Sequence, residues 1–146
     1  MERVVVKKLN RIMDERGYLQ EIMRNDDDQF TEFGQIYITT TNPGVIKGWH
    51  YHKEQVDNVC CIKGNIKLVL WDGKEIKEIF LGEDNPKLVT IPKGIYHGWK
   101  GISKDPSFIL NMPDKAYDYK NPDEVRVNPH NNDIPYDWKS NRDIDG

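Results

Sequence analysis

The sequence predicts an all-β fold, a sandwich or barrel built from many short strands. Short runs rich in β-branched and aromatic residues recur along the chain, and strands favour this composition. Turn signals separate these runs at intervals of roughly 8–12 residues, and hardly any segment has helical periodicity. The 146 residues fit one domain with a sizeable core, and no internal repeat or low-complexity linker divides them.

The expected strands alternate with turns along most of the chain. The clearest turns are 42–44 (Asn-Pro-Gly) and 72–73 (Asp-Gly), the second of which is a strong hairpin signal. Residues 14–17 form another turn, and residues 29–33 are expected to form one helical turn. In chain order, the predicted strands are 1–12, 18–23, 35–41, 45–52, 57–62, 66–71, 76–81, 88–91 and 107–111.

The character of the sequence changes after residue 106. Prolines, tyrosines and tryptophan punctuate the remainder, and proline lacks the N–H that a β ladder needs, so this stretch cannot be regular sheet. We expect residues 1–112 to form the barrel and residues 113–146 to form an irregular, Pro- and Tyr-rich arm packed on the same domain. The arm covers apolar surface of the barrel or of a partner subunit, or it forms a lid over a pocket.

The overall charge argues against general nucleic-acid binding. The chain has 21 basic and 24 acidic side chains and a net charge of −3, whereas nucleic-acid binding depends on clustered positive charge. No apolar run approaches the roughly 18 residues that a membrane span needs, and the N-terminus has no signal-peptide core. The adjacent Cys60 and Cys61 point to opposite faces of a strand and suit a reducing compartment. These features predict a soluble, cytoplasmic protein.

Three of the four histidines belong to one spaced pattern. His50 and His52 lie in Gly-Trp-His-Tyr-His, Asp57 follows shortly after, and His97 ends Pro-Lys-Gly-Ile-Tyr-His. Residues i and i+2 of a strand point to one face, so His50 and His52 can enter one cavity, and a hairpin return brings Asp57 and His97 to it. Three imidazoles and a carboxylate make either a metal site or an acid–base site. With the strands, this spacing favours a cupin-type jelly-roll β-barrel.

Several motifs occur in a specific order along the chain. They lie at 14–17 (Asp-Glu-Arg-Gly), 45–51 (Val-Ile-Lys-Gly-Trp-His-Tyr), 91–99 (Ile-Pro-Lys-Gly-Ile-Tyr-His-Gly-Trp) and 134–138 (Ile-Pro-Tyr-Asp-Trp). The ordered set resembles the dTDP-4-dehydrorhamnose 3,5-epimerase family, and the chain looks like a short, divergent member. The resemblance implies a homodimeric cupin enzyme that acts on a nucleotide-linked sugar and requires no cofactor.

The resemblance also implies roles for individual residues. It makes His50 the base that removes a proton α to the C4 ketone of the sugar, and it places His97 in the sugar site. It assigns Lys47 and Arg16 to the diphosphate and Gln35 to the nucleotide base. On a regular strand Lys47 points away from His50, so it reaches the same cavity only through a twist or bulge.

Two departures from the family pattern affect the chemistry. The family's active-site lysine falls at Asp57 and its acid tyrosine at Leu110, so the usual donors to an enolate oxygen are missing. Tyr117 is the candidate replacement for the acid, with Tyr119 beside it for substrate binding. Trp99 is placed to stack on a base or a sugar.

Three interpretations of the site remain open. In the first, Asp57 orients and charge-stabilises a histidine base, and His97 in its protonated form is the candidate electrophile. The protein is then an epimerase or isomerase of a dTDP-type 4-keto-6-deoxyhexose in deoxysugar or polysaccharide biosynthesis. In the second, His50, His52, Asp57 and His97 hold a divalent metal, as in a dioxygenase or a metal-dependent sugar isomerase. In the third, the cavity binds a sugar nucleotide without turning it over. The first two conflict, because a metal-bound His50 cannot also accept a proton.

Overall fold

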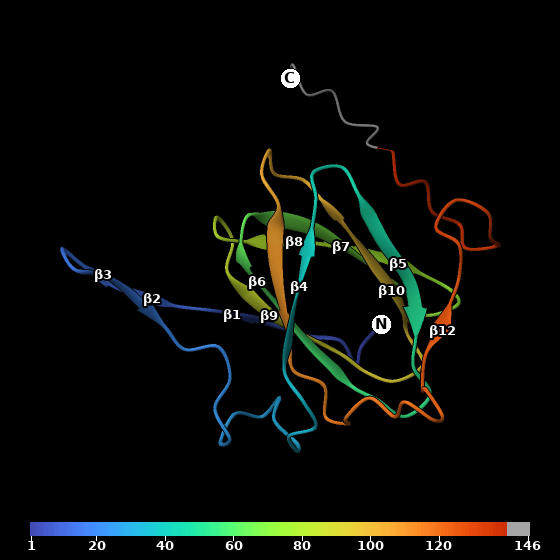
Figure 1. Ribbon diagram of the computed structural model, residues 1–146, viewed down its shortest axis with the longest axis horizontal. Coiled ribbons are helices and arrows are strands. Elements are labelled where there is room, and N and C mark those ends of the chain that lie inside the picture. The colour runs from blue at the N-terminus through green and yellow to red at the C-terminus, as the bar shows by residue number, and fades with distance from the viewer. Residues whose placement is uncertain (140–146) are drawn as a thin grey trace.

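Two five-stranded antiparallel sheets face each other in the computed structural model, which describes residues 1–139 (Figure 1). These residues contain no helix, and hence none that could cross a membrane, so the all-β prediction is confirmed. The first sheet has the order β1 (Val5–Lys8), β9 (Lys87–Ile91), β6 (Asp57–Lys63), β11 (Ser107–Asn111) and β4 (Tyr37–Thr41). The second has the order β12 (Val125–Arg126), β5 (Ile46–Tyr51), β10 (Tyr96–Gly101), β7 (Asn65–Trp71) and β8 (Ile76–Gly82). A separate hairpin joins β2 (Arg11–Asp14) to β3 (Gly17–Gln20).

The core lies between the two sheets because alternate residues of each strand point inward. Leu68 and Leu70 of β7 belong to the same fully buried cluster as Ile109 of β11, in the opposite sheet. The inward faces of other strands carry polar groups, among them Asp57 on β6 and His97 on β10, both nearly fully buried. The polar site is therefore built on the same inward faces as the hydrophobic core.

The strand that carries His97 is absent from the sequence prediction. The sequence of β10 is Tyr-His-Gly-Trp-Lys-Gly. It has two glycines and no β-branched residue, so its composition does not predict a strand. Pairing with neighbours on both sides, β5 and β7, stabilises it instead. His97 is thus held in the middle of a sheet rather than in a turn.

Two predictions near the N-terminus are wrong in detail. The single strand predicted for 1–12 is interrupted, because β1 pairs with β9 whereas β2 turns away to pair with β3. The helical turn predicted for 29–33 is absent. Phe30 donates its backbone N–H to the carbonyl oxygen of Asp27 at 3.1 Å, and the Gln29 amide is buried against the Thr90 hydroxyl at 2.7 Å. Residue 29 thus ends a turn at residues 25–29, and residues 30–33 have no regular structure.

The arm crosses the edge and then the outer face of the second sheet. Within its described part, β12 pairs with the edge strand β5 (Figure 1), so the expectation that this stretch contains no sheet is wrong there. Val125 and Arg126 lie between prolines, and their own N–H groups remain available for pairing. Trp138 then packs on Trp49 of β5, with ring centroids 5.2 Å apart. Residues 140–146, predicted as the end of the arm, lie outside the described residues.

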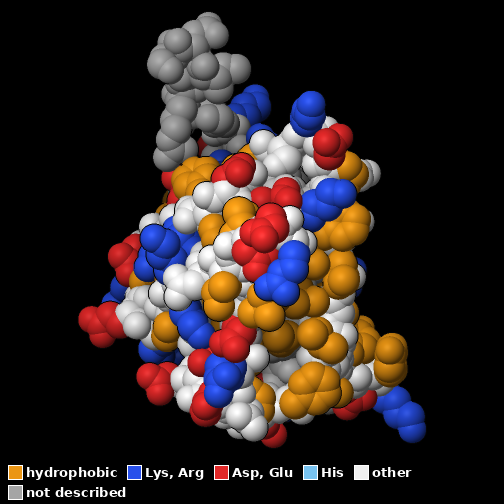
Figure 2. All heavy atoms as spheres, turned by 90° about the vertical axis from the view of Figure 1, so that its left-hand side faces the viewer, with side chains coloured by type: hydrophobic (Ala, Val, Ile, Leu, Met, Phe, Trp, Pro, Cys, Tyr) orange, Lys and Arg blue, Asp and Glu red, His pale blue; other side chains and the backbone are white. Residues whose placement is uncertain are grey.

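The β2–β3 hairpin projects away from both sheets (Figure 1). It exposes large apolar side chains, with Ile12 at 72%, Met13 at 68% and Leu19 at 59% exposure. Figure 2 views the molecule from the hairpin's side and shows hydrophobic side chains gathered along one part of that face. Contiguous apolar surface of this kind marks interaction sites more often than free surface.

Candidate active site

A bulge in β5 turns Lys47 to the same side as His50. In the ladder between β5 and β10, His50 lies opposite His97, whereas Lys47 lies opposite Trp99, so β5 has one extra residue between these pairs. Gly48 occupies the bulge with a φ of 150°, and a Cβ there would lie 2.6 Å from a backbone atom of β10. Lys47 and His50 consequently line one cavity of about 120 Å³.

Asp57 contacts two imidazoles inside the barrel. Its Oδ2 lies 3.2 Å from the Nε2 atoms of both His52 and His97, and its Oδ1 accepts a hydrogen bond from the Gln55 amide at 2.6 Å. Only 4% of the Asp57 side chain and 3% of the His97 side chain are exposed. The ring of His50 lies 6.0 Å from that of His97. The structure thus brings together all four residues that the histidine pattern singles out.

Electrostatic attraction among Asp57, His52 and His97 outweighs the free-energy cost of burying their charges. Burial opposes ionisation of Asp57, but hydrogen bonds from His52 and His97 prevail and hold the pKa of the carboxyl far below its usual range. Burial likewise opposes protonation of His52, yet the hydrogen bond and charge of Asp57 prevail and raise the pKa of His52 to about 9. At neutral pH the group therefore contains a carboxylate and a positively charged imidazole.

His50 has the opposite protonation behaviour. Burial, followed by repulsion from the charge on His97, lowers the pKa of His50 to about 4. Among residues 1–139, no side chain or backbone group hydrogen-bonds to its ring. At neutral pH His50 is a neutral imidazole that lines the cavity, and the neutral form is the protonation state that a general base requires.

Tyr37 is a site residue that sequence reasoning missed. It lies on β4, lines the same cavity as His50, and its hydroxyl oxygen accepts a hydrogen bond from the Asn111 amide at 2.8 Å. Because Asn111 is the donor in that bond, the hydroxyl hydrogen of Tyr37 is available to another acceptor. Burial, followed by the negative charge of Asp57, raises the pKa of Tyr37, so the phenol stays protonated at neutral pH. The sequence signal was its place in the predicted strand 35–41, which does not tell which face points inward.

A second cavity, of about 300 Å³, adjoins the first and leads to the arm. The two cavities share Tyr37, His52 and Glu124. Gln35 and Tyr117 line the second cavity, and the side-chain oxygen of Gln35 accepts the backbone N–H of Tyr117. Two residues predicted to act on substrate therefore lie on a wall that is continuous with the histidine site.

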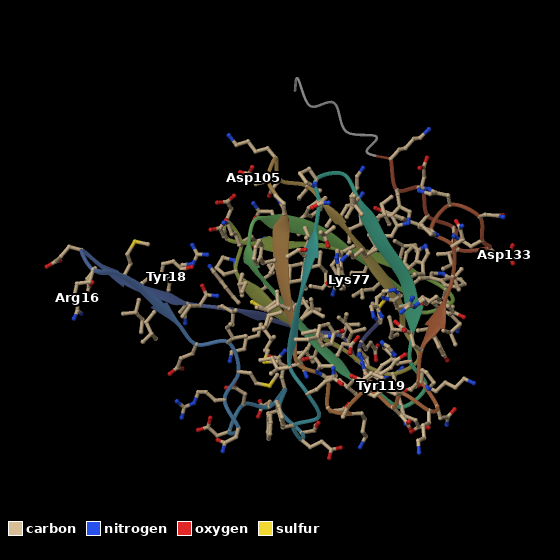
Figure 3. The ribbon with its side chains drawn as sticks, viewed as in Figure 1. Arg16, Tyr18, Lys77, Asp105, Tyr119 and Asp133 are labelled. Atoms are coloured by element: carbon tan, nitrogen blue, oxygen red, sulfur yellow. The ribbon has the colours of Figure 1, made fainter. Side chains whose placement is uncertain are left out.

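The remaining predicted substrate-binding residues lie at different depths. Trp99 is buried beside His50, and its indole N–H donates to the Thr41 hydroxyl at 2.9 Å. Tyr119 is 89% exposed, on the arm beside Tyr117 (Figure 3). Arg16 lies at the end of the β2–β3 hairpin, away from both sheets (Figure 3). The structure does not bring Arg16 to the histidines of its own chain.

His52, Asp57 and His97 also form a donor set that fits a divalent metal. One ligand atom from each residue lies within 4.8 Å of the others. The Nδ1 atoms of His52 and His97 face backbone carbonyl oxygens at 2.5 and 3.0 Å, so each Nδ1 carries a hydrogen. A metal would bind the Nε2 atoms in place of the hydrogens that they donate to Asp57. His50, the fourth ligand of the metal hypothesis, is not part of this group. Base and metal ligands are different residues here, which removes the conflict over His50.

Comparisons with known proteins agree with this architecture. Residues 12–125 match the polysaccharide biosynthesis C-terminal domain family. A probable low-salt glycan biosynthesis epimerase of Haloferax volcanii is 37% identical, over 94% of this chain and 94% of its own length. A spore coat polysaccharide biosynthesis protein of Bacillus subtilis is 34% identical, over 96% of this chain and 97% of its own length. The crystal structure of a dTDP sugar isomerase from Desulfovibrio desulfuricans has a TM-score of 0.87 and 26% identity, covering 94% of this chain and 91% of that one.

Fold, site and relatives together define a cupin-like protein of the sugar epimerase and isomerase group. More specifically, the chain belongs to the polysaccharide biosynthesis C-terminal domain family. The predicted relationship to sugar-nucleotide epimerases is thereby confirmed.

Proposed function

We propose that this protein is an isomerase that epimerises or ketoisomerises a nucleotide-linked 4-keto-6-deoxy sugar. The observation that carries the proposal is His50, an uncharged imidazole with a pKa of about 4 that faces a cavity next to Tyr37. The relatives support the substrate class, since they include a glycan biosynthesis epimerase and a dTDP sugar isomerase.

In the proposed reaction, His50 takes a proton from the carbon next to the C4 ketone. The electron pair of the broken C–H bond moves onto the ketone oxygen and forms an enolate. Tyr37 donates its hydroxyl hydrogen to that oxygen, and the positive charge on His52 stabilises the developing negative charge. Tyr117, on the wall of the adjoining cavity, is the second candidate for the acid.

The site of reprotonation decides the product. A proton returned to the same carbon from the opposite face gives an epimer. A proton delivered to C4, with loss of the C3 hydroxyl proton, gives the 3-keto isomer. Asp57 is proposed to act through its partners, since its contacts hold His52 and His97 in place beside the base.

The predicted substrate-binding residues are assigned by their positions. Lys47 and Trp99 line the cavity of His50 and are proposed to contact the sugar end of the substrate. Gln35 lines the second cavity, and Tyr119 lies on the arm beside Tyr117, which also lines it; Gln35 and Tyr119 are proposed to contact the nucleoside.

Arg16 fits the proposal only if the protein is a homodimer. The β2–β3 hairpin carries Arg16 away from its own sheets and exposes Ile12, Met13 and Leu19. A hairpin with such an apolar surface can dock on a second copy and deliver Arg16 to the site of that copy. We therefore propose a homodimer in which each hairpin contacts the partner.

A metal-dependent reaction is the second candidate, favoured by the donor set of His52, Asp57 and His97. A divalent ion at these residues would act as a Lewis acid toward the ketone oxygen while His50 remains the base. Elemental analysis after dialysis tests it. The metal-dependent reaction is supported if wild type contains one metal ion per chain and Asp57→Asn contains none. It is ruled out if wild type still catalyses proton exchange after the metal has been removed completely.

Solvent deuterium exchange into a dTDP-linked 4-keto-6-deoxyglucose tests the main proposal. Wild type is expected to incorporate deuterium at C3 or C5, and His50→Asn to lose this activity by at least about 100-fold. The matched control is His130→Asn, which alters an exposed histidine on the arm. Binding of the sugar nucleotide without exchange by wild type would leave a non-catalytic binding protein in place of the isomerase.

The cellular setting is also part of the proposal. Both cysteines are buried free thiols, and burial raises the pKa of Cys60 to about 11 and that of Cys61 to about 12, which suits a reducing cytoplasm. Deoxysugar supply for polysaccharides is the role that fits the family. We further propose that residues 1–112 and 113–146 act as the barrel and the arm of one domain.

A further inference from the structure

We propose that Arg126, on the arm, binds the diphosphate of the substrate at the mouth of the histidine cavity. This inference rests on the proposed function. Arg126 lies outside all the sequence motifs that carry the resemblance to the epimerase family. It begins from a row of three side chains across three paired strands. His97 on β10 lies opposite His50 on β5, and His50 lies opposite Arg126 on β12.

The register places the guanidinium beside the base. Directly opposed residues of an antiparallel pair project from the same face, with Cβ atoms about 5 Å apart. The Arg126 side chain therefore leaves the sheet on the same side as the His50 imidazole. The side chain of Arg126 is 75% exposed and does not line the cavity, whereas its ion-pair partner Glu124 does, so the guanidinium lies outside the cavity at its edge.

Glu124 holds Arg126 in this position without using all of its donors. One carboxylate oxygen, Oε2, accepts hydrogen bonds from Nε at 3.1 Å and from Nη2 at 3.0 Å. A guanidinium has five N–H groups, so three remain for a ligand. Glu124 itself is 18% exposed and lines both cavities. An exposed ion pair of this kind contributes little to stability, so its rearrangement around an anion costs little.

The size of the cavity explains why an anion belongs at its mouth. About 120 Å³ lies below the roughly 300–1,000 Å³ typical of sites that enclose a whole small molecule. With the sugar at His50 and the nucleoside in the second cavity, the diphosphate has to pass between the two cavities, where Glu124, the partner of Arg126, lines both. Lys47, the cation deeper in, already donates to the Thr39 hydroxyl at 2.9 Å and to the Thr40 carbonyl oxygen. The forked donors of Arg126 match phosphate oxygens better than a single ammonium does.

Binding of dTDP, UDP and thymidine to the full chain tests this inference by titration calorimetry. Arg126→Ala is expected to weaken binding of dTDP and UDP by at least about tenfold, to leave thymidine binding unchanged, and to reduce the salt dependence of dTDP binding. Arg126→Lys, which keeps the charge without the fork, should lose less affinity. The matched control is Arg24→Ala, which removes an arginine from a similar ion pair, with Asp26, outside both cavities.

The outcomes separate this inference from the proposed function. If Arg126→Ala binds dTDP as tightly as wild type, or if wild type binds neither diphosphate, the assignment of Arg126 is wrong whatever the exchange assay shows. If wild type catalyses no deuterium exchange but its dTDP affinity depends on Arg126, the isomerase proposal fails and the anion site stands. If Arg126→Ala and Arg24→Ala lose the same dTDP affinity, the loss reflects general surface charge, and the assignment of Arg126 is wrong.

Discussion

Asp57→Asn provides the sharpest test of the charge arrangement in the barrel. The substitution keeps the size of the side chain but removes the negative charge that Oδ2 presents to His52 and His97 at 3.2 Å. The pKa of His52 is raised from 6.5 to about 9, and each pKa unit corresponds to about 1.4 kcal/mol. The interaction therefore stabilises the folded protein by about 3 kcal/mol, within the range for breaking a buried ion pair.

The pH dependence of this loss has a definite sign. Because the pKa of His52 is raised on folding, its contribution is complete below about pH 6.5 and disappears as the pH rises through about 9. The pKa of Asp57 is lowered on folding, so its contribution is present above its ordinary value near 4 and disappears as the pH falls. Near pH 10 the carboxylate remains but His52 is neutral, so the ion pair no longer exists. The destabilisation of Asp57→Asn is therefore expected to be largest near pH 5.5 and small near pH 10.

Urea unfolding of chelator-treated wild type and Asp57→Asn at pH 5.5 and pH 10 measures this difference. Asp133→Asn, in an exposed segment of the arm, is the matched control and should change the free energy of unfolding by less than about 0.5 kcal/mol (Figure 3). A loss of the same size at both pH values would show that packing, and not charge, explains the effect. No loss at pH 5.5 would refute the ion-pair reasoning altogether.

Two further predictions concern the residues around the base. Tyr37→Phe removes the available hydroxyl hydrogen, so the rate of deuterium exchange should fall about 100-fold. The free energy of unfolding in urea should change by only about 1 kcal/mol. Full exchange by the variant would contradict the acid role of Tyr37 and favour Tyr117. Gly48→Ala places a Cβ 2.6 Å from the backbone of β10 at a φ of 150° and should destabilise the protein by about 2 kcal/mol or more. Gly73→Ala, at a φ of 97° with no atom nearby, measures the cost of the backbone conformation alone, and an equal loss in both variants would contradict the close-approach argument.

The sequence predicted much of the framework, because local signals specify it. Alternating β-branched runs and the Asp-Gly turn at 72–73 identified the β7–β8 hairpin. The spacing of His50, His52, Asp57 and His97 identified four side chains that the structure brings together. These features depend on the period of the strand and on turn chemistry, and both are visible in one chain.

What the sequence did not predict depends on tertiary contacts. β10 forms because β5 and β7 pair with it on both sides, although Gly98 and Gly101 weaken its own propensity. Tyr37 reaches the site through the register of β4, and Arg126 is placed beside the site by a two-residue pairing in a proline-rich arm. The approach of Lys47 to the cavity required a bulge whose position the sequence did not specify.

The rate of solvent deuterium exchange as a function of pH tests the role of His50 most directly. With the pKa of this imidazole lowered to about 4, wild type should keep its exchange rate nearly constant from pH 8 down to pH 5 and lose half of it near pH 4, while His50→Asn shows no exchange at any pH. A midpoint near pH 6.5, or exchange that survives in His50→Asn, would mean that another group removes the proton.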